Sequence, residues 1–112
     1  MDKIIRLYSR LSALKQNLPQ NFHIHEKYIK EYHLIVDELS AVSNLNLDEF
    51  KIPTSEVKPY VAGYSPSRGT MYSKENHCEK TYVLSKVDAL LMYFQMTTSK
   101  EKENIGFKPP NQ

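Results

Sequence analysis

Apolar side chains recur three and four positions apart in three stretches of the chain, and this spacing predicts three helices. In the first stretch, residues 3–18, the apolar positions fall on one helical face: Ile4, Leu7, Leu11, Leu14 and Leu18, widened by Ile5 and Tyr8. Pro19 lacks the backbone N–H that a continuing helix needs, and its ring disfavours helical geometry at Leu18. The first helix is therefore predicted to end there.

The second stretch, residues 24–45, repeats the same spacing. Its apolar face contains Tyr28, Tyr32, Ile35, Leu39 and Val42, with Ile29 and Val36 on the flank. A short connection between two helices makes them antiparallel neighbours. The basic residues at the start of the first helix should then lie near acidic residues in the second half of the second. These residues are Lys3, Arg6 and Arg10 on one side and Asp37 and Glu38 on the other.

The third stretch, residues 73–97, is the most apolar, with Ser73 as its expected N-cap. Its stripe consists of Val83, Leu84, Val87, Leu90, Leu91 and Phe94, and Tyr82, Met92, Tyr93 and Met96 extend apolar surface around most of the circumference. A helix that is apolar nearly all round must be covered on more than one side. This excess predicts a homodimer or a larger protein partner, with Leu90 and Phe94 among the contacts.

Residues 47–72 show no helical period, and prolines and glycines interrupt them repeatedly. An irregular joint of this length is usually functional, mobile or ordered by another element. Two extended pieces, Pro59–Tyr64 and Thr70–Ser73, flank the turn-like sequence Ser65–Gly69, which indicates a small β-hairpin. The polar residues 98–112 are predicted to form a flexible C-terminal tail.

Together these patterns predict a mainly α fold. We expect a three-helix bundle with an antiparallel N-terminal hairpin and a long irregular loop before the third helix. Residues 1–97 would form one domain, followed by the tail. A chain of 112 residues with 40% hydrophobic and 25% charged residues fits a single small globular domain. A core of that size leaves a thin stability margin, which burial shared with a partner would increase.

Charge and cysteine content narrow the class of protein. A formal net charge of +2 is too small to imply a polyanion as ligand. The single cysteine, Cys78, cannot form an intramolecular disulfide, so we expect a protein of the reducing cytoplasm. No apolar run approaches the ~18 residues that span a bilayer, and no secretory signal is evident. The amphipathic, basic first helix leaves an organelle transit peptide as an alternative.

The residues that could perform catalysis or bind metal do not form a known pattern. His23 and His25 are two apart, a spacing that suits a shared metal only in extended chain. His25 and His33 are eight apart and could face the same way, but a clear third ligand is lacking. Adjacent residues on a helix point about 100° apart, so His77 and Cys78 would not form a catalytic dyad. We therefore expect no enzyme, no metal site and no cofactor.

The loop from Tyr60 to Lys74 combines tyrosines with basic residues, and two functions fit this combination. Tyrosine and arginine are enriched at the hot spots of protein interfaces, but they also stack on bases and contact phosphates. The tyrosines could equally fold back onto the core. The leading hypothesis is a protein-interaction or oligomerisation module that binds through Tyr64, Arg68, Tyr72, Leu90 and Phe94. The alternative is a nucleic-acid-binding regulatory protein that uses Lys3, Arg6, Arg10 and Arg68.

Two segments, YSKENHCEKTYVLSKVDALLMYF at Tyr72–Phe94 and LDEFKIPTSEV at Leu47–Val57, carry a resemblance that covers about a third of the chain. They resemble small uncharacterised bacterial helical proteins that look like accessory components of mobile-element or antiviral defence loci. The resemblance implies a bacterial accessory protein. It includes no catalytic motif and assigns no role to any residue.

Overall fold

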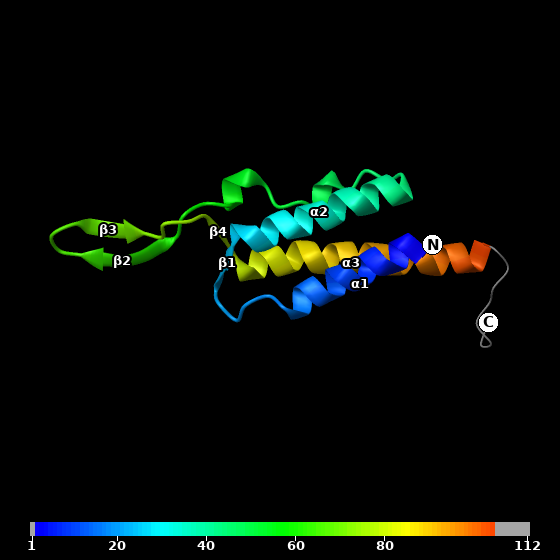
Figure 1. Cartoon of the computed structure of the whole chain (residues 1–112), viewed down its shortest axis with the longest axis horizontal. Helices are drawn as coiled ribbons and strands as arrows, with labels where there is room; N and C mark the ends of the chain where they lie inside the picture. The colour runs from blue at the N-terminus through cyan, green and yellow to red at the C-terminus, as the bar shows by residue number, and fades with distance from the viewer. Residues whose placement is uncertain (1, 105–112) are drawn as a thin grey trace.

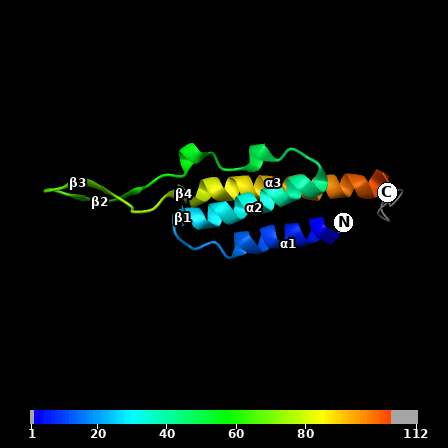
Figure 2. The ribbon, with the colours of Figure 1, turned by 45° about the horizontal axis from the view of Figure 1, so that its top comes forward.

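The structure is a computed structural model that describes residues 2–104, with side-chain surroundings for residues 3–96. The chain is mainly helical, as predicted. Its long helices are α1 (Asp2–Gln16), α2 (Glu26–Ser43) and α3 (Lys80–Asn104), and α1 packs against both of the others. Helix α1 runs antiparallel to α2, which confirms the predicted N-terminal hairpin (Figures 1 and 2). The molecule is elongated, with extents of 69 × 29 × 20 Å.

Two small antiparallel sheets complete the described fold. Strand β1 (His23–His25) pairs with β4 (His77–Glu79), with Ile24 opposite Cys78. Strands β2 (Val61–Ser65) and β3 (Gly69–Tyr72) form a hairpin that projects beyond the end of the helices (Figure 1). The β1–β4 pair joins the entry of α2 to the entry of α3 and was not predicted from the sequence.

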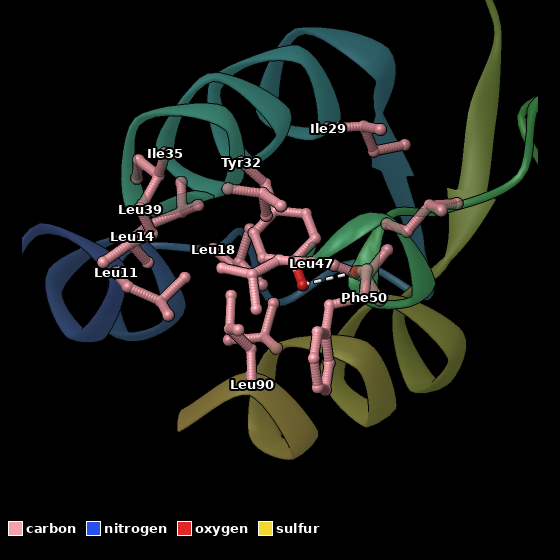
Figure 3. Close-up of a cluster of buried hydrophobic side chains, with 14 of the residues drawn as sticks. Leu11, Leu14, Leu18, Ile29, Tyr32, Ile35, Leu39, Leu47, Phe50 and Leu90 are labelled. Atoms are coloured by element: carbon pink, nitrogen blue, oxygen red, sulfur yellow. Dashed lines mark hydrogen bonds between the residues drawn. The ribbon is translucent and has the colours of Figure 1, made fainter. Parts of the chain in front are cut away.

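The core is formed by the predicted helical stripes (Figure 3). Its buried members from the helices are Leu7, Leu11, Leu14, Ile29, Tyr32, Ile35, Val36, Leu39, Val83, Val87, Leu90 and Phe94. Two residues assigned to the apolar faces of the first and second helices lie outside the core, because Ile5 and Val42 are exposed. The expected charge pairing is present between Arg10 and Glu38, whose nitrogen and oxygen lie 2.7 Å apart.

The segment 47–57 belongs to the core, although the sequence predicts an irregular joint. It contains the 3₁₀ helices η1 (Asp48–Phe50) and η2 (Thr54–Glu56), and Leu47, Phe50 and Ile52 are buried. The Tyr32 hydroxyl of α2 donates a hydrogen bond of 2.6 Å to the Phe50 carbonyl. From α3, the Lys86 ammonium donates one of 2.7 Å to the Glu49 carbonyl. The segment thus connects α2 with α3.

The predicted bounds of the third helix are wrong at its start. Helix α3 begins at Lys80, because residues 77–79 pair with β1 instead of continuing a helix from Ser73. Ser73 does not cap a helix: its hydroxyl accepts a hydrogen bond from the Tyr60 N–H and donates one to the Glu75 carbonyl. At its other end α3 continues to Asn104, so residues 98–104 of the predicted tail are helical, and residues 105–112 lie outside the described residues.

None of the helices within residues 2–104 combines the length and the apolar character that crossing a bilayer requires.

The partly buried imidazole of His33 predicts that the free energy of unfolding depends on pH. Burial lowers the pKa of His33 below its ordinary value of 6.5, and the positive charge of Lys51 lowers it further, against a smaller opposing effect of Asp37. The neutral ring also accepts a hydrogen bond of 3.0 Å from the Ile52 N–H. The unfolded chain therefore binds a proton more readily than the folded protein. The free energy of unfolding should fall as the pH drops from 6.5 toward the lowered value.

Urea denaturation at about pH 7.5 and about pH 5.5 measures this loss. His33→Gln is the matched variant, because an amide can still accept a hydrogen bond but does not titrate. The wild type should lose more stability between the two pH values than the variant does. Equal losses in the two proteins would contradict the assignment, since the other histidines are common to both.

Candidate interaction site: the hairpin arm and the cleft at its base

The projecting hairpin, which we call the arm (residues 60–73), is built on a well-formed turn. The Arg68 N–H donates a hydrogen bond of 3.2 Å to the Ser65 carbonyl, and Ser65 pairs with Gly69 across the strands. Gly69 has φ of +75°, in the left-handed region that glycine adopts without steric cost. Three residues therefore separate the paired Ser65 and Gly69, a loop length that is common in β-hairpins. The predicted hairpin is thus confirmed.

One face of the arm carries apolar side chains that are open to solvent. Cross-strand partners point to the same side of a sheet, so Tyr64 shares a face with Thr70, and Val61 shares one with Tyr72. An irregularity between Val61 and Gly63 shifts the register by one residue and brings both pairs to the same side. Tyr64, Tyr72 and Val61 are 74%, 62% and 61% exposed. We call Val61, Tyr64, Thr70 and Tyr72 the arm face.

Backbone hydrogen bonds continue from the arm into the helical part of the molecule. At the base of the arm, the Ser73 N–H donates to the Tyr60 carbonyl over 2.8 Å. Two residues before Tyr60, the backbone of Lys58 exchanges two hydrogen bonds of 2.9 Å with the backbone of His77 in β4. The arm is therefore anchored at its base by a single antiparallel bridge between Lys58 and β4.

Stacked rings reinforce this anchor. The rings of His23 and Tyr60 are nearly parallel, at 5°, with centroids 3.8 Å apart. Tyr60 meets His77 edge-to-face at 4.9 Å, and His77 meets His25 in the same way at 5.1 Å. These four residues form what we call the histidine–tyrosine cluster. It joins three segments that are far apart in the sequence.

His25 in this cluster is engaged at both ring nitrogens. Its Nδ1 accepts a hydrogen bond of 3.0 Å from the Lys27 N–H and so caps the N-terminus of α2. The proton must then be on Nε2, which faces the carboxylate of Glu75. Within the part of the chain that the structure describes, no group of three or more His, Cys, Asp or Glu residues is arranged to hold a metal ion. The rings of the cluster pack against one another, and His25 also caps α2.

A cleft of 430 Å³ opens at the base of the arm. Val61 and Tyr72 line it and also belong to the arm face, so the two surfaces are continuous. Tyr60 and Tyr72 give the cleft an aromatic lining, which we call its aromatic wall. The carboxylates of Glu56 and Glu79 also line the cleft, and they outnumber its one ammonium group, that of Lys58. The cleft therefore combines an aromatic wall with a net negative charge.

Cys78 stands between His77 and Glu79, which line the cleft, but it is poorly placed for nucleophilic chemistry. Its side chain is 2% exposed. Burial raises the pKa of the thiol to about 11, and the carboxylates of Glu56 and Glu79 contribute to the rise. Reactive cysteines lie in exposed, electropositive surroundings that favour the thiolate, and those of Cys78 have the opposite character.

The structure separates the residues that the sequence assigned to partner binding. Tyr64, Arg68 and Tyr72 lie together on the arm and are exposed. Leu90 and Phe94 do not join them, because they are 0% and 4% exposed and are covered by the core of the chain itself. The apolar side chains that α3 does expose are instead those of Met92 and Met96, on the flanks that the sequence analysis noted.

The residues of the nucleic-acid alternative also lie apart. Lys3, Arg6 and Arg10 line a 360 Å³ groove between α1 and α2, and Arg10 is paired with Glu38 there. The turn of the arm, which carries Arg68, is at the opposite end of the molecule from the start of α1 (Figure 1). These four basic residues do not form one continuous surface.

The contact between His23, Tyr60 and His77 was not predicted from the sequence. A weak signal was present, because the sequences His23–His25 and His77–Glu79 each place one apolar residue between two polar ones. That alternation is the period of a half-buried strand, although three residues are too few to distinguish it from chance.

No family model, no curated protein and no solved structure matches the chain.

Proposed function

We propose that the protein is a non-enzymatic interaction or oligomerisation module, an accessory or regulatory subunit that binds protein through its arm. The observation that carries the proposal is the exposed arm face, with Tyr64, Tyr72 and Val61 turned to solvent outside the helical part of the molecule. A two-stranded hairpin is at best marginally stable by itself in water. Cover from a partner would stabilise the arm and remove its apolar face from water.

The strand edges of the arm support a protein as the ligand. Proteins protect free strand edges with charged residues or proline, because unprotected edges pair with other chains. Strands β2 and β3 contain neither, since Arg68 and Pro66 both lie in the turn between them. Addition of a strand to such an edge is a common mode of protein recognition. Exposed tyrosines beside the edge would provide the side-chain contacts.

The resemblance of residues 47–57 and 72–94 to bacterial accessory proteins bears on the class of partner. We extend the proposal to a larger protein, or a further copy of the chain, in a mobile-element or defence system. The resemblance supports the kind of system in which we place the protein. The arm face supports the way in which it would bind.

Co-purification from the native host, read by quantitative mass spectrometry, tests the role of the arm. We expect the double variant Tyr64→Ala, Tyr72→Ala to recover its partner at least about tenfold less efficiently than the wild type, because truncated hot-spot residues cost about 2 kcal/mol or more, roughly thirtyfold in affinity. Met92→Ala removes a similarly exposed apolar side chain on α3 and should leave recovery unchanged.

Light scattering on the purified wild-type protein completes this test, because a second copy would escape the mass-spectrometric comparison. A strictly monomeric protein that recovers nothing from the host would refute the proposal. Recovery that is equal for the wild type and the double variant would refute the role of the arm.

A further inference from the structure

The two ends of the arm carry complementary chemistry. Arg68 at the turn is exposed and is the one charged residue between positions 60 and 73. At the base of the arm, Glu56 and Glu79 give the cleft its net negative charge. We propose that the partner of the arm is a second copy of this chain, with two arms side by side in opposite directions and each turn seated in the cleft of the other copy. This inference rests on the proposed function and specifies its partner.

The complementary groups cannot meet within one chain. Strand β2 has five residues, and at about 3.4 Å per residue it separates the turn from the base by roughly 17 Å. Arg68 is held away from its own cleft by that length of hairpin. The turn of one copy can therefore approach such a cleft only in a second copy.

A two-fold axis satisfies both ends at once. In a symmetric dimer the same patch is used on both subunits, so a contact between residue i and residue j occurs twice. Arms that run in opposite directions bring the turn of each to the base of the other. The pairing of Arg68 with Glu56 and Glu79 is then made twice, without any group that this chain does not supply.

The apolar side chains follow the same arrangement. On the arm face, Tyr64 lies toward the turn, whereas Val61 and Tyr72 lie toward the base. Antiparallel arms therefore place Tyr64 of one copy against Val61 and Tyr72 of the other. Within the cleft, the guanidinium of Arg68 would approach the ring of Tyr60, which is a favourable geometry for a cation–π contact.

The uncharged strand edges allow the two hairpins to join. Pairing of one edge from each arm would produce a four-stranded antiparallel sheet, and sheets of three or more strands have the stability that an isolated hairpin lacks. Self-pairing would therefore cover one edge of each arm and bring the two arm faces side by side on the same surface of the sheet.

Charge exchange between two variants tests the proposal in the full chain. One variant is Arg68→Glu, and the other is the double change Glu56→Lys, Glu79→Lys. Sedimentation equilibrium and light scattering should give the wild type twice the 13.1 kDa mass of the chain. Each variant alone places like charges at both contacts, so we expect its dimer dissociation constant to rise at least about tenfold.

Mixing the two variants should restore the dimer. In the mixed pair, the glutamate introduced at position 68 of one copy faces a cleft that carries the two introduced lysines. The native Arg68 of the other copy faces a native cleft, so both contacts are attractive again. Arg6→Glu makes the same charge change at the far end of the molecule and should remain dimeric. Circular dichroism melting curves confirm that each variant is folded before association is compared.

A monomeric wild type, a dimer that is insensitive to Arg68→Glu, or a mixture that stays monomeric would each overturn this inference. These outcomes remain separable from failure of the proposed function. A monomer that recovers another protein through Tyr64 and Tyr72 removes self-pairing alone. A monomer that recovers nothing removes both.

Discussion

Replacing Leu90 with alanine should lower the free energy of unfolding by about 2–5 kcal/mol. Leu90 is 0% exposed and points from α3 into the centre of the core, toward Leu18 and Tyr32 (Figure 3). Truncation to alanine removes buried methyl groups and leaves a cavity that the surrounding helices can only partly fill. The loss would be a large fraction of the stability of a domain this small.

Urea denaturation followed by circular dichroism measures this change, with Met92→Ala as the control on the same helix. The Met92 side chain is 62% exposed, so its truncation should change the free energy of unfolding by less than about 0.5 kcal/mol. Similar stabilities for the two variants would contradict the orientation of α3, because that orientation places Leu90 inside and Met92 outside.

Replacing Phe50 with alanine should lower the free energy of unfolding by about 3 kcal/mol, at the lower end of the range for a buried phenylalanine. Phe50 lies in η1, is 9% exposed, and its ring centroid is 5.5 Å from that of Tyr93 on α3. Its carbonyl also accepts the hydrogen bond from Tyr32 on α2. The substitution therefore loosens the contact that joins the two helices.

The same denaturation experiment, with Glu49→Ala as the control, checks this prediction. Glu49 is the neighbouring residue and exposes its side chain, while its backbone carbonyl keeps the hydrogen bond from Lys86. We also expect trypsin to cleave after Lys51 faster in the Phe50 variant than in the control. Stability close to that of the wild type would mean that residues 47–57 are the loose joint that their sequence pattern suggests.

The helices could be predicted because their apolar positions repeat with the helical period over several turns. The buried residues of the segment 47–57 do not repeat in this way. Leu47, Phe50 and Ile52 are spaced by three and by two, which matches neither a helix nor a strand. Their burial depends on the surface that α2 and α3 present together, and that surface exists only in the folded chain.

The candidate site could be predicted in part. Two extended pieces around a proline- and glycine-containing turn indicated the hairpin, and its tyrosines and Arg68 were singled out from composition. The cleft could not be predicted, since it requires β4 to meet β1 and Lys58 from distant positions. Leu90 and Phe94 were misassigned because an apolar stripe marks the inner face of a helix, and the chain itself covers that face of α3.

The elongated shape of the molecule has a consequence for its behaviour in solution. The radius of gyration is 18.1 Å, whereas a compact domain with the length of this chain would have about 13 Å. The observed value is that of a compact protein of about 250 residues. A single copy should consequently diffuse slowly and elute early from a gel-filtration column, at the volume of a globular protein of roughly twice its mass.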